Sequence, residues 1–364
     1  MKAGIVGLPN VGKSTLFNCL SNAKAQSANF PFCTIEPNIG VVNVPDPRLQ
    51  KLEELVKPDR VQPATVDIVD IAGLVKGASK GEGLGNQFLG NIRECNAIIH
   101  VLRCFDNDNI VHVDGNVNPI RDKETIDIEL QLKDLDTIEK RLEKVKRAAK
   151  TGNKEAQAEE ALLNRIREAL LQAKSARTVQ PKNADEEALM ESFQLITTKP
   201  VLYVCNVDEE SAAHGNTYVE QVRELVKDEN AQVIVLAVGT EADITELETY
   251  EERQMFLEDL GLIEPGASVL IRAAYKLLNL QTYFTAGVKE VRAWTINIGD
   301  TAPQAAGVIH SDFEKGFIRA EVIAYEDYVH FGSEAKVKEA GKLRVEGKEY
   351  IVKDGDVMHF RFNV

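Results

Sequence analysis

The chain has 364 residues, of which 44% are hydrophobic and 27% charged, a composition that excludes wholesale disorder and fibrous repeats. Its 43 basic and 57 acidic side chains leave a formal net charge of −14. A protein that coats nucleic acid non-specifically is therefore excluded, and any nucleic-acid contact must use a locally basic patch. No apolar run approaches the roughly 18 residues of a membrane span, and no signal peptide is evident. Five scattered cysteines without a Cys-x-x-Cys pair argue against disulfides and zinc, so we expect a cytoplasmic protein without membrane contact.

The first and third quarters of the chain alternate apolar strand patterns with helical patterns. Such alternation predicts a mostly parallel sheet with helices on both faces. We expect a doubly wound α/β domain formed by residues 1–120 and 199–280. Its predicted strands are Ala3–Val6, Ile39–Val44, Thr65–Val69, Ala97–Leu102, Val201–Cys205 and Gln232–Val238, and its predicted helices include Ser14–Leu20 and Tyr218–Lys227.

A phosphate-binding motif follows the first predicted strand. Gly7–Ser14 fits G-x-x-x-x-G-K-[ST] and opens a helix, which is the context that this motif requires. Backbone N–H groups of such a loop surround a phosphate. We expect Lys13 to reach the β- and γ-phosphates and the Ser14 hydroxyl to bind Mg²⁺. The remaining nucleotide contacts are assigned to Asn10, Val11, Gly12 and Thr15.

A second motif, D-x-x-G, comes directly after the strand Thr65–Val69. Asp70 is expected to hold Mg²⁺ through water, and the Gly73 N–H to meet the γ-phosphate. Thr34, in the loop between the first helix and the next strand, is assigned to the metal, although an ordinary loop threonine is the alternative. Leu74 stands where Ras-like enzymes carry the glutamine that orients water, so either hydrolysis is slow or another group positions the water.

His112 is the candidate for that other group. It lies in the loop after the strand Ala97–Leu102, and loops at the carboxyl ends of strands line the ligand crevice of a doubly wound sheet. A neutral imidazole can orient the attacking water or accept its proton. The alternative is a loop histidine that packs locally. His100, inside an apolar strand, is expected to be a core residue.

Residues 121–198 form a predicted insertion. Apolar residues from Leu135 to Ala149 and from Leu162 to Ala173 recur at spacings of three and four, with a helix-breaking Thr151–Lys154 between them. This pattern predicts an antiparallel coiled-coil hairpin. Within it, Lys140–Lys150 carries six basic residues against one acidic residue. The run is either a solvated helix face or a patch that contacts phosphates.

From residue 281 onward, alternating apolar and polar residues predict short strands separated by Gly-Asp and Asp-Gly turns. Residues 281–364 are therefore expected to form a small α+β domain. The predicted strands are Val291–Ile296, Phe317–Val322, Leu343–Val345 and Val357–Phe362.

Asn206-Val207-Asp208-Glu209 follows a strand at the place where GTPases carry N-K-x-D. Glutamate is one methylene longer than aspartate and would crowd the guanine edge. Asn206 can still bond the N6/N7 edge of adenine. The site is therefore unfit for strict guanine selection, and the alternative is a turn with no base contact.

Together these motifs make the whole chain similar to the Obg-like ATPase family, also called YchF. The resemblance rests on Gly7–Thr15, Phe30–Thr34, Asp70–Leu74, Asn206–Glu209 and the coiled-coil insertion. It implies Mg²⁺-dependent hydrolysis with ATP favoured over GTP, ribosome binding, and a C-terminal TGS domain. It also implies that Glu209 completes an N-x-x-E motif, that a backbone group at Val207 contacts adenine, and that Leu74 is the family's hydrophobic replacement of glutamine.

We therefore expect a slow, Mg²⁺-dependent P-loop ATPase that acts as a nucleotide-controlled switch. Its expected partner is the ribosome, as the large subunit or the whole particle, or structured RNA, and it is expected to act as a monomer. The first alternative is a GTPase switch of the translation-factor class. The second is a ribosome- or RNA-binding module whose nucleotide site is mainly structural.

Overall fold

The computed structural model describes residues 1–22, 39–71 and 85–363. The chain divides into two compact units, one made of Met1–Gly40 and Asp67–Leu270 and the other of Val41–Val66 and Ile271–Val364. The coiled-coil insertion belongs to the first unit. Residues 41–66, which the sequence placed in the nucleotide domain, group instead with the C-terminal residues, because Pro47–Val56 and Val61–Gln62 pack and pair there. The two ends of this segment still belong to strands of the first unit's sheet.

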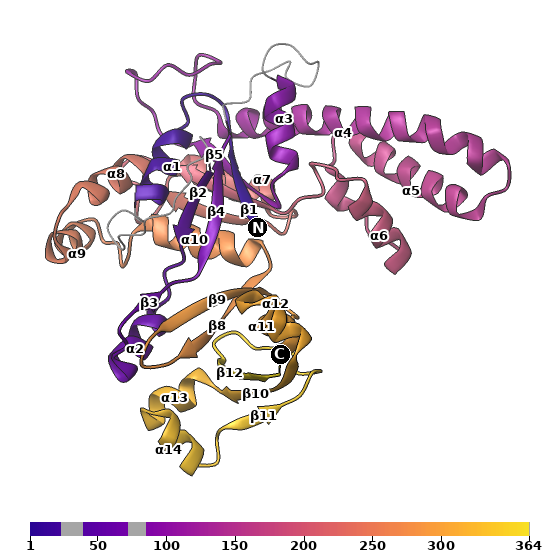
Figure 1. The fold of residues 1–364 in the computed structure, drawn as a ribbon. Coiled ribbons are helices and arrows are strands. Elements are labelled where there is room, and N and C mark those ends of the chain that lie inside the picture. Colours follow the sequence, from indigo (N-terminus) through magenta and orange to yellow (C-terminus); the bar gives the residue numbers. More distant parts are fainter. Residues whose placement is uncertain (23–38, 72–84, 364) are drawn as a thin grey trace. The chain divides into compact units, whose positions relative to one another are not determined.

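The first unit contains a six-stranded sheet in the order β2-β4-β1-β5-β6-β7 (Figure 1). β1 runs parallel to β4 and β5, β5 to β6, and β6 to β7. The predicted doubly wound, mostly parallel sheet is therefore confirmed. Its strands are β1 (Lys2–Val6), β2 (Ile39–Asn43), β4 (Thr65–Asp70), β5 (Ala97–Arg103), β6 (Val201–Asn206) and β7 (Gln232–Leu236).

Helices connect these strands, and their apolar residues fall at helical spacing. In α7 (Thr217–Val226), Val219, Val222 and Val226 are buried, and the Asn216 side chain caps the first turn. β7 ends two residues earlier than predicted because α8 begins at Val238. The other helices here are α1 (Lys13–Asn22), α3 (Gly85–Arg93), α8 (Val238–Glu246), α9 (Tyr250–Asp259) and α10 (Gly266–Leu277), the last of which crosses the division between the units.

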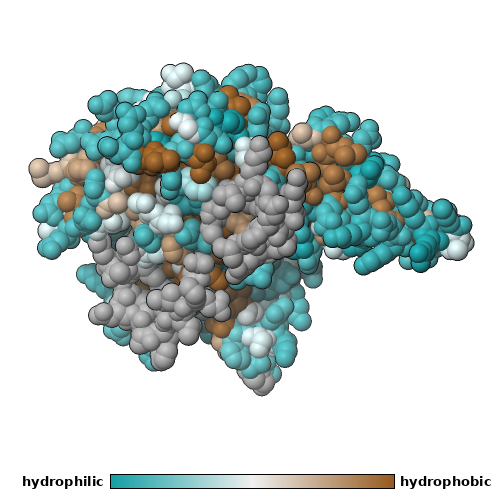
Figure 2. Space-filling model, turned by 90° about the horizontal axis from the view of Figure 1, so that it is seen from above, coloured by the Kyte–Doolittle hydropathy of each residue, from teal (hydrophilic) through white to brown (hydrophobic). Residues whose placement is uncertain are grey.

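The predicted hairpin is present and forms an arm that projects from the sheet of the first unit (Figure 1). It consists of α4 (Pro119–Lys150), α5 (Lys154–Leu171) and α6 (Ala184–Ser192), with a short 3₁₀ turn at Ala176–Thr178. The expected seam is buried, and the outer end of the arm is hydrophilic (Figure 2). No helix in the described part of the chain combines the length and apolar character that crossing a bilayer requires. The seam includes Ile138, Leu142, Leu162, Ile166 and Leu170.

The second unit has its own six-stranded mixed sheet, in the order β11-β10-β12-β8-β9-β3. The predicted C-terminal strands are found, but the sheet also includes β8 and β3, which begin before residue 281. Its strands are β3 (Val61–Gln62), β8 (Leu280–Ala286), β9 (Val291–Asn297), β10 (Phe317–Ile323), β11 (Arg344–Glu346) and β12 (Val357–Phe362).

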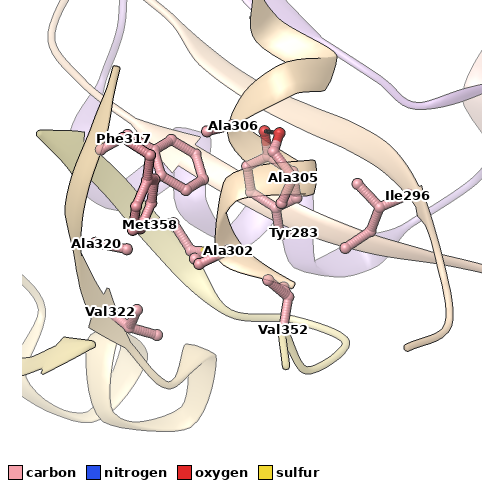
Figure 3. Packing of buried hydrophobic residues seen from close by; sticks show 11 residues of the cluster. Tyr283, Ile296, Ala302, Ala305, Ala306, Phe317, Ala320, Val322, Val352 and Met358 are labelled. Atoms are coloured by element: carbon pink, nitrogen blue, oxygen red, sulfur yellow. Dashed lines mark hydrogen bonds between the residues drawn. The ribbon is translucent and has the colours of Figure 1, made fainter. Parts of the chain in front are cut away.

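Small residues allow a helix to pack closely on this second sheet. α11 (Ala302–Ile309) buries three alanines, and Figure 3 shows them among Tyr283, Phe317 and Met358. The Tyr283 hydroxyl donates to the Ala305 carbonyl at 2.9 Å, so this buried phenol is satisfied. The other helices of the unit are α2 (Pro47–Val56), α12 (Ser311–Lys315), α13 (Tyr325–Phe331) and α14 (Glu334–Glu339).

Candidate nucleotide site

The loop between β1 and α1 is the predicted phosphate loop, and close packing requires its glycines. Gly12 has a φ of +98°, and a Cβ there would lie 2.5 Å from the Asn206 amide nitrogen. A Cβ on Gly7 would lie 2.6 Å from the Val101 carbonyl oxygen. Both separations are shorter than real Cβ contacts, so only glycine fits at either position.

Lys13 lies beneath this loop with its ammonium group withdrawn from solvent. The residue is 6% exposed, and its Nζ donates to the Leu8 carbonyl at 2.6 Å. Burial lowers the pKa of Lys13 to about 8, although the nearby Asp70 carboxylate raises it. A buried cation that is held by a carbonyl is well placed to bind an anion that enters the loop.

Ser14 and Asp70 come together beside the loop, as predicted from two separate motifs. The Ser14 hydroxyl donates to Asp70 Oδ2 at 3.3 Å. The other carboxylate oxygen, Asp70 Oδ1, is buried and finds no hydrogen-bond partner among the described residues. A hydroxyl beside an unsatisfied carboxylate oxygen offers the hard ligands that Mg²⁺ prefers, so these residues fit that ion. Thr34, Gly73 and Leu74 lie outside the described residues.

Asn206 connects two loops of the candidate base site. Its Nδ2 donates to the Val11 carbonyl at 2.9 Å, and its Oδ1 accepts from the Val238 N–H at 3.0 Å. The amide therefore joins the phosphate loop to the start of α8, whereas the sequence suggested that it faces a purine. Val207 is 3% exposed and its N–H donates to the Leu236 carbonyl, while Glu209 is exposed.

The loop after β5 is built around Arg103, which the sequence analysis missed. This side chain is 1% exposed and donates to three carbonyls of the loop, with N–O distances of 2.9–3.2 Å. The loop then reaches the phosphate loop, because Asn10 Nδ2 donates to the Val111 carbonyl at 3.1 Å. A charged residue at the end of the apolar strand Ala97–Leu102 was the available signal. The carbonyls belong to Phe105, Asn107 and Ile110.

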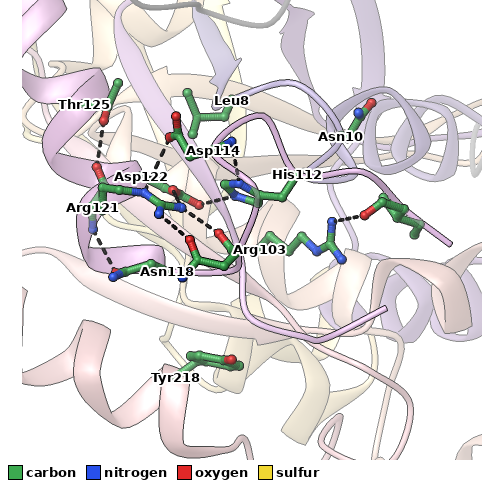
Figure 4. A network of polar contacts seen from close by, with 12 residues as sticks. Leu8, Asn10, Arg103, His112, Asp114, Asn118, Arg121, Asp122, Thr125 and Tyr218 are labelled. Atoms are coloured by element: carbon green, nitrogen blue, oxygen red, sulfur yellow. Dashed lines mark hydrogen bonds and ion pairs between the residues drawn. The ribbon is translucent and has the colours of Figure 1, made fainter. Parts of the chain in front are cut away.

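His112 follows Val111 and points into the protein (Figure 4). Its Nε2 lies 2.8 Å from Asp122 Oδ2, and its Nδ1 accepts from the Asp114 backbone N–H at 3.1 Å. Both side chains of this hydrogen-bonded pair are nearly inaccessible, at 3% and 1% exposure. The loop is therefore beside the phosphate loop, but in this conformation both ring nitrogens are occupied. Asp122 was not singled out from the sequence.

His100 is a buried core residue, as predicted. It is 2% exposed, and its ring lies 5.6 Å from that of Tyr203. Burial lowers the pKa of His100 to about 3, so the ring stays neutral at physiological pH. The four cysteines in the described part of the chain are likewise buried and free.

A basic groove of about 460 Å³ lies at the root of the arm, within the first unit. Within it, Lys140 pairs with Asp136 at 2.8 Å, and Arg141 pairs with Glu159 at 2.5 Å and lies 4.5 Å from the Phe193 ring. The groove can receive an anionic group. It is lined by Arg93, Lys133, Lys140, Arg141 and Lys144, together with Asp136.

Comparison with known proteins gives matches along the whole chain. The family described as "50S ribosome-binding GTPase" matches residues 2–148, and one described as "Protein of unknown function (DUF933)", with a model named for the YchF GTPase C-terminus, matches residues 280–363. The "Ribosome-binding ATPase YchF" of Escherichia coli O157:H7 is 59% identical over 363 residues, covering 100% of this chain and 99% of the relative. The protein of the same name from Bacillus subtilis (strain 168) is 56% identical over 366 residues and covers 100% of both. The solved YchF GTPase of Schizosaccharomyces pombe is 38% identical, with a TM-score of 0.90 over 99% of this chain and 97% of that one.

Proposed function

Because the chain belongs to the YchF family, we propose that it is a Mg²⁺-dependent nucleoside triphosphatase that favours ATP over GTP and acts as a slow switch on the ribosome. The observation that supports triphosphate hydrolysis is the buried Lys13 ammonium beside the Ser14 and Asp70 oxygens. Lys13→Ala should abolish turnover by purified protein. Turnover that persists in this variant would instead favour a structural nucleotide site.

Each residue of the phosphate site has a distinct part in this proposal. Lys13 exchanges its bond to the Leu8 carbonyl for the β- and γ-phosphates, and the loop N–H groups from Asn10 to Thr15 surround the phosphates. Ser14 and Asp70 would hold Mg²⁺, with Thr34 as a further ligand, and the Gly73 N–H would meet the γ-phosphate. Mg²⁺ bound there would neutralise charge that develops on the transferred phosphoryl group.

Selectivity for ATP is assigned to the segment after β6. The Val207 N–H is already used by Leu236, so a backbone contact to the base falls to the Val207 carbonyl. A carbonyl accepts from the adenine N6 amine and repels the guanine O6. Glu209 adds bulk where GTPases carry aspartate. Asn206 contributes by fixing the two loops that flank the base.

Restoring a GTPase-like motif tests this assignment. Val207→Lys with Glu209→Asp should move the ratio of ATP to GTP affinity toward GTP, measured by competition titration. Val207 is 3% exposed, and a lysine there must displace buried packing. Glu209→Asp alone, at an exposed position, is therefore the companion variant and should shift the ratio in the same direction. An unchanged ratio in both variants would remove Val207 and Glu209 from base recognition.

Positioning of the attacking water is assigned to His112. The support is the bond between Asn10 and Val111, which brings the preceding residue to the phosphate loop. His112→Ala should lower turnover at least tenfold, equivalent to about 1.4 kcal/mol of barrier, while ATP affinity changes by no more than a few-fold. Wild-type turnover in the variant would show that substrate, metal and a ribosomal group position the attacking water without His112.

Ribosome binding is assigned to the arm and the C-terminal unit. Action in the cytoplasm and as a monomer is part of the same proposal. The basic groove at the arm root supplies the positive surface that a −14 chain needs for phosphate contact. Co-sedimentation with ribosomes, and with free structured RNA as the competing ligand, tests this assignment. Sedimentation that is insensitive to salt would argue against phosphate contacts.

A further inference from the structure

We propose that Asp122 is a positioning residue that orients His112 for proton transfer, so that the two act as a pair. The proposal rests on the hydrolytic function and on the role of His112 given above. It adds a residue from the first turns of the arm helix α4 and assigns a separate task to each imidazole nitrogen.

The hydrogen bonds define which nitrogen carries the proton. The Asp114 backbone N–H donates to Nδ1 at 3.1 Å, and a nitrogen that accepts an N–H bond carries no proton of its own. In the neutral ring the proton therefore sits on Nε2, which donates to Asp122 Oδ2 at 2.8 Å. This leaves Nδ1 as the basic atom. An aspartate that fixes a histidine tautomer in this way is a known catalytic arrangement.

Asp122 is itself held in place. Its other oxygen, Oδ1, accepts from the Arg121 guanidinium at 3.1 Å, and Arg121 also donates to Asn116 Oδ1 at 2.6 Å. The Asn118 side chain caps α4 immediately before these residues. A carboxylate near a helix N-terminus is stabilised by the helix dipole. Asp122 is thus a fixed, compensated anion against one side of the imidazole (Figure 4).

The other side of the ring faces a replaceable partner. The donor to Nδ1 is a backbone N–H only two residues along the same loop, and the O–H of a water molecule can take its place when that loop shifts. The water oxygen then bonds to the γ-phosphorus, and the bond from that phosphorus to the β–γ bridging oxygen breaks. ADP leaves, the water proton passes to Nδ1, and Asp122 stabilises the resulting imidazolium until the proton returns to solvent.

The test compares Asp122→Asn with His112→Ala and with the double variant. The amide introduced by Asp122→Asn offers an N–H to Nε2 and so favours the wrong tautomer. We expect kcat to fall at least tenfold while KM for ATP stays within threefold, and the double variant to be no slower than His112→Ala. Asp127→Asn is the matched control, because it makes the same chemical change five residues along α4, where Lys123 keeps its pair with Glu229 at 2.7 Å.

A second readout does not depend on activity. In ¹⁵N NMR of the full chain, wild-type His112 should show a proton on Nε2, and Asp122→Asn should shift the population toward Nδ1. Asp122→Glu keeps the carboxylate and should recover part of kcat if the amide variant folds poorly. Wild-type or raised kcat in Asp122→Asn, with His112→Ala still defective, would overturn the proposal and leave the function intact. Full activity in His112→Ala would instead remove the histidine from the mechanism.

Discussion

Lys13 combines a positive charge with burial, and this combination makes nucleotide binding depend on pH. Its pKa is lowered from the ordinary 10.5 to about 8 in the free protein, whereas a bound polyphosphate favours the charged amine. Above pH 8 binding must therefore take up a proton, so ATP affinity should fall with rising pH, by up to tenfold per unit. Titration calorimetry in buffers of different ionisation enthalpy measures this uptake.

The matched variant for this prediction is Lys13→Met, which keeps a long side chain but cannot titrate. It should bind ATP more weakly and show no proton uptake between pH 8 and 10. Equal uptake in both proteins would assign the proton to a different group.

The absence of a side chain at Gly12 is expected to be essential for ATP binding. Gly12→Ala brings a methyl group to 2.5 Å from the Asn206 amide in a backbone conformation that favours glycine. The loop and Asn206 must then separate, and we expect at least tenfold weaker ATP binding by equilibrium titration. Gly90→Ala is the control, since a Cβ there meets nothing within 4 Å. Similar affinities for the two variants would contradict this account of the loop.

At the scale of an element, one cation of the arm holds the hairpin together, whereas Lys140, Lys144 and Arg147 are exposed on its surface. Arg141 bonds Glu159 on α5 and stacks over Phe193, so it holds the hairpin together. We therefore expect the triple change Lys140→Glu, Lys144→Glu and Arg147→Glu to abolish ribosome co-sedimentation without affecting ATP binding. Arg141 is left unchanged, because Arg141→Glu would also destabilise the arm and so obscure the effect on ribosome binding.

The control for the arm variant must carry the same change in net charge. Arg223 and Lys227 lie outside both the arm and the C-terminal unit and pair with Glu220 and Glu224, three residues away. Glutamates at these two positions match the charge change of the double variant Lys144→Glu with Arg147→Glu and should leave co-sedimentation unchanged. Partial arm variants should reduce the salt dependence of binding by about one unit per lost contact. Normal co-sedimentation of the triple variant would indicate that Lys140–Lys150 is a solvated helix face that does not contact the ribosome.

At the scale of the whole molecule, the second unit is assembled from two distant segments. β3 pairs in parallel with β9 through Val61 and Val291. Arg48 of α2 donates to Asp354 at 2.8 Å and lies 5.3 Å from the Phe284 ring. Burial of Leu49 and Leu52 accompanies these contacts. A chain that ends at residue 280 therefore loses the partners of α2 and β3.

We expect this shortened chain, residues 1–280, to unfold several degrees below the full chain and to bind a hydrophobic dye, because α2 is left uncovered. Thermal unfolding followed by circular dichroism measures the shift. Arg48→Ala in the full chain tests the same contacts without truncation and should cost about 1–3 kcal/mol. A shortened chain that melts with the full one would show that residues 41–66 do not need the C-terminal segment.

Much of this protein follows from local patterns in its sequence. The phosphate loop, the Asp70 motif and the arm are encoded by residues close together in the chain. For such features, backbone preference and apolar periodicity are sufficient signals. Ser14 and Asp70 then meet at one edge of the sheet, because Asp70 ends β4 and Ser14 follows the carboxyl end of β1, its parallel neighbour.

Other features were decided only by the tertiary structure. Residues 47–62 carry ordinary helix and strand patterns, and nothing in those patterns says whether they pack on the first sheet or on the second. Asn206 carries the same amide whether it faces a base or joins two loops. Asp122 lies ten residues from His112 and gains its role only when the Arg103-centred loop folds back onto α4. In each case the choice depends on which buried polar groups find partners, and the whole fold must be in place before that is determined.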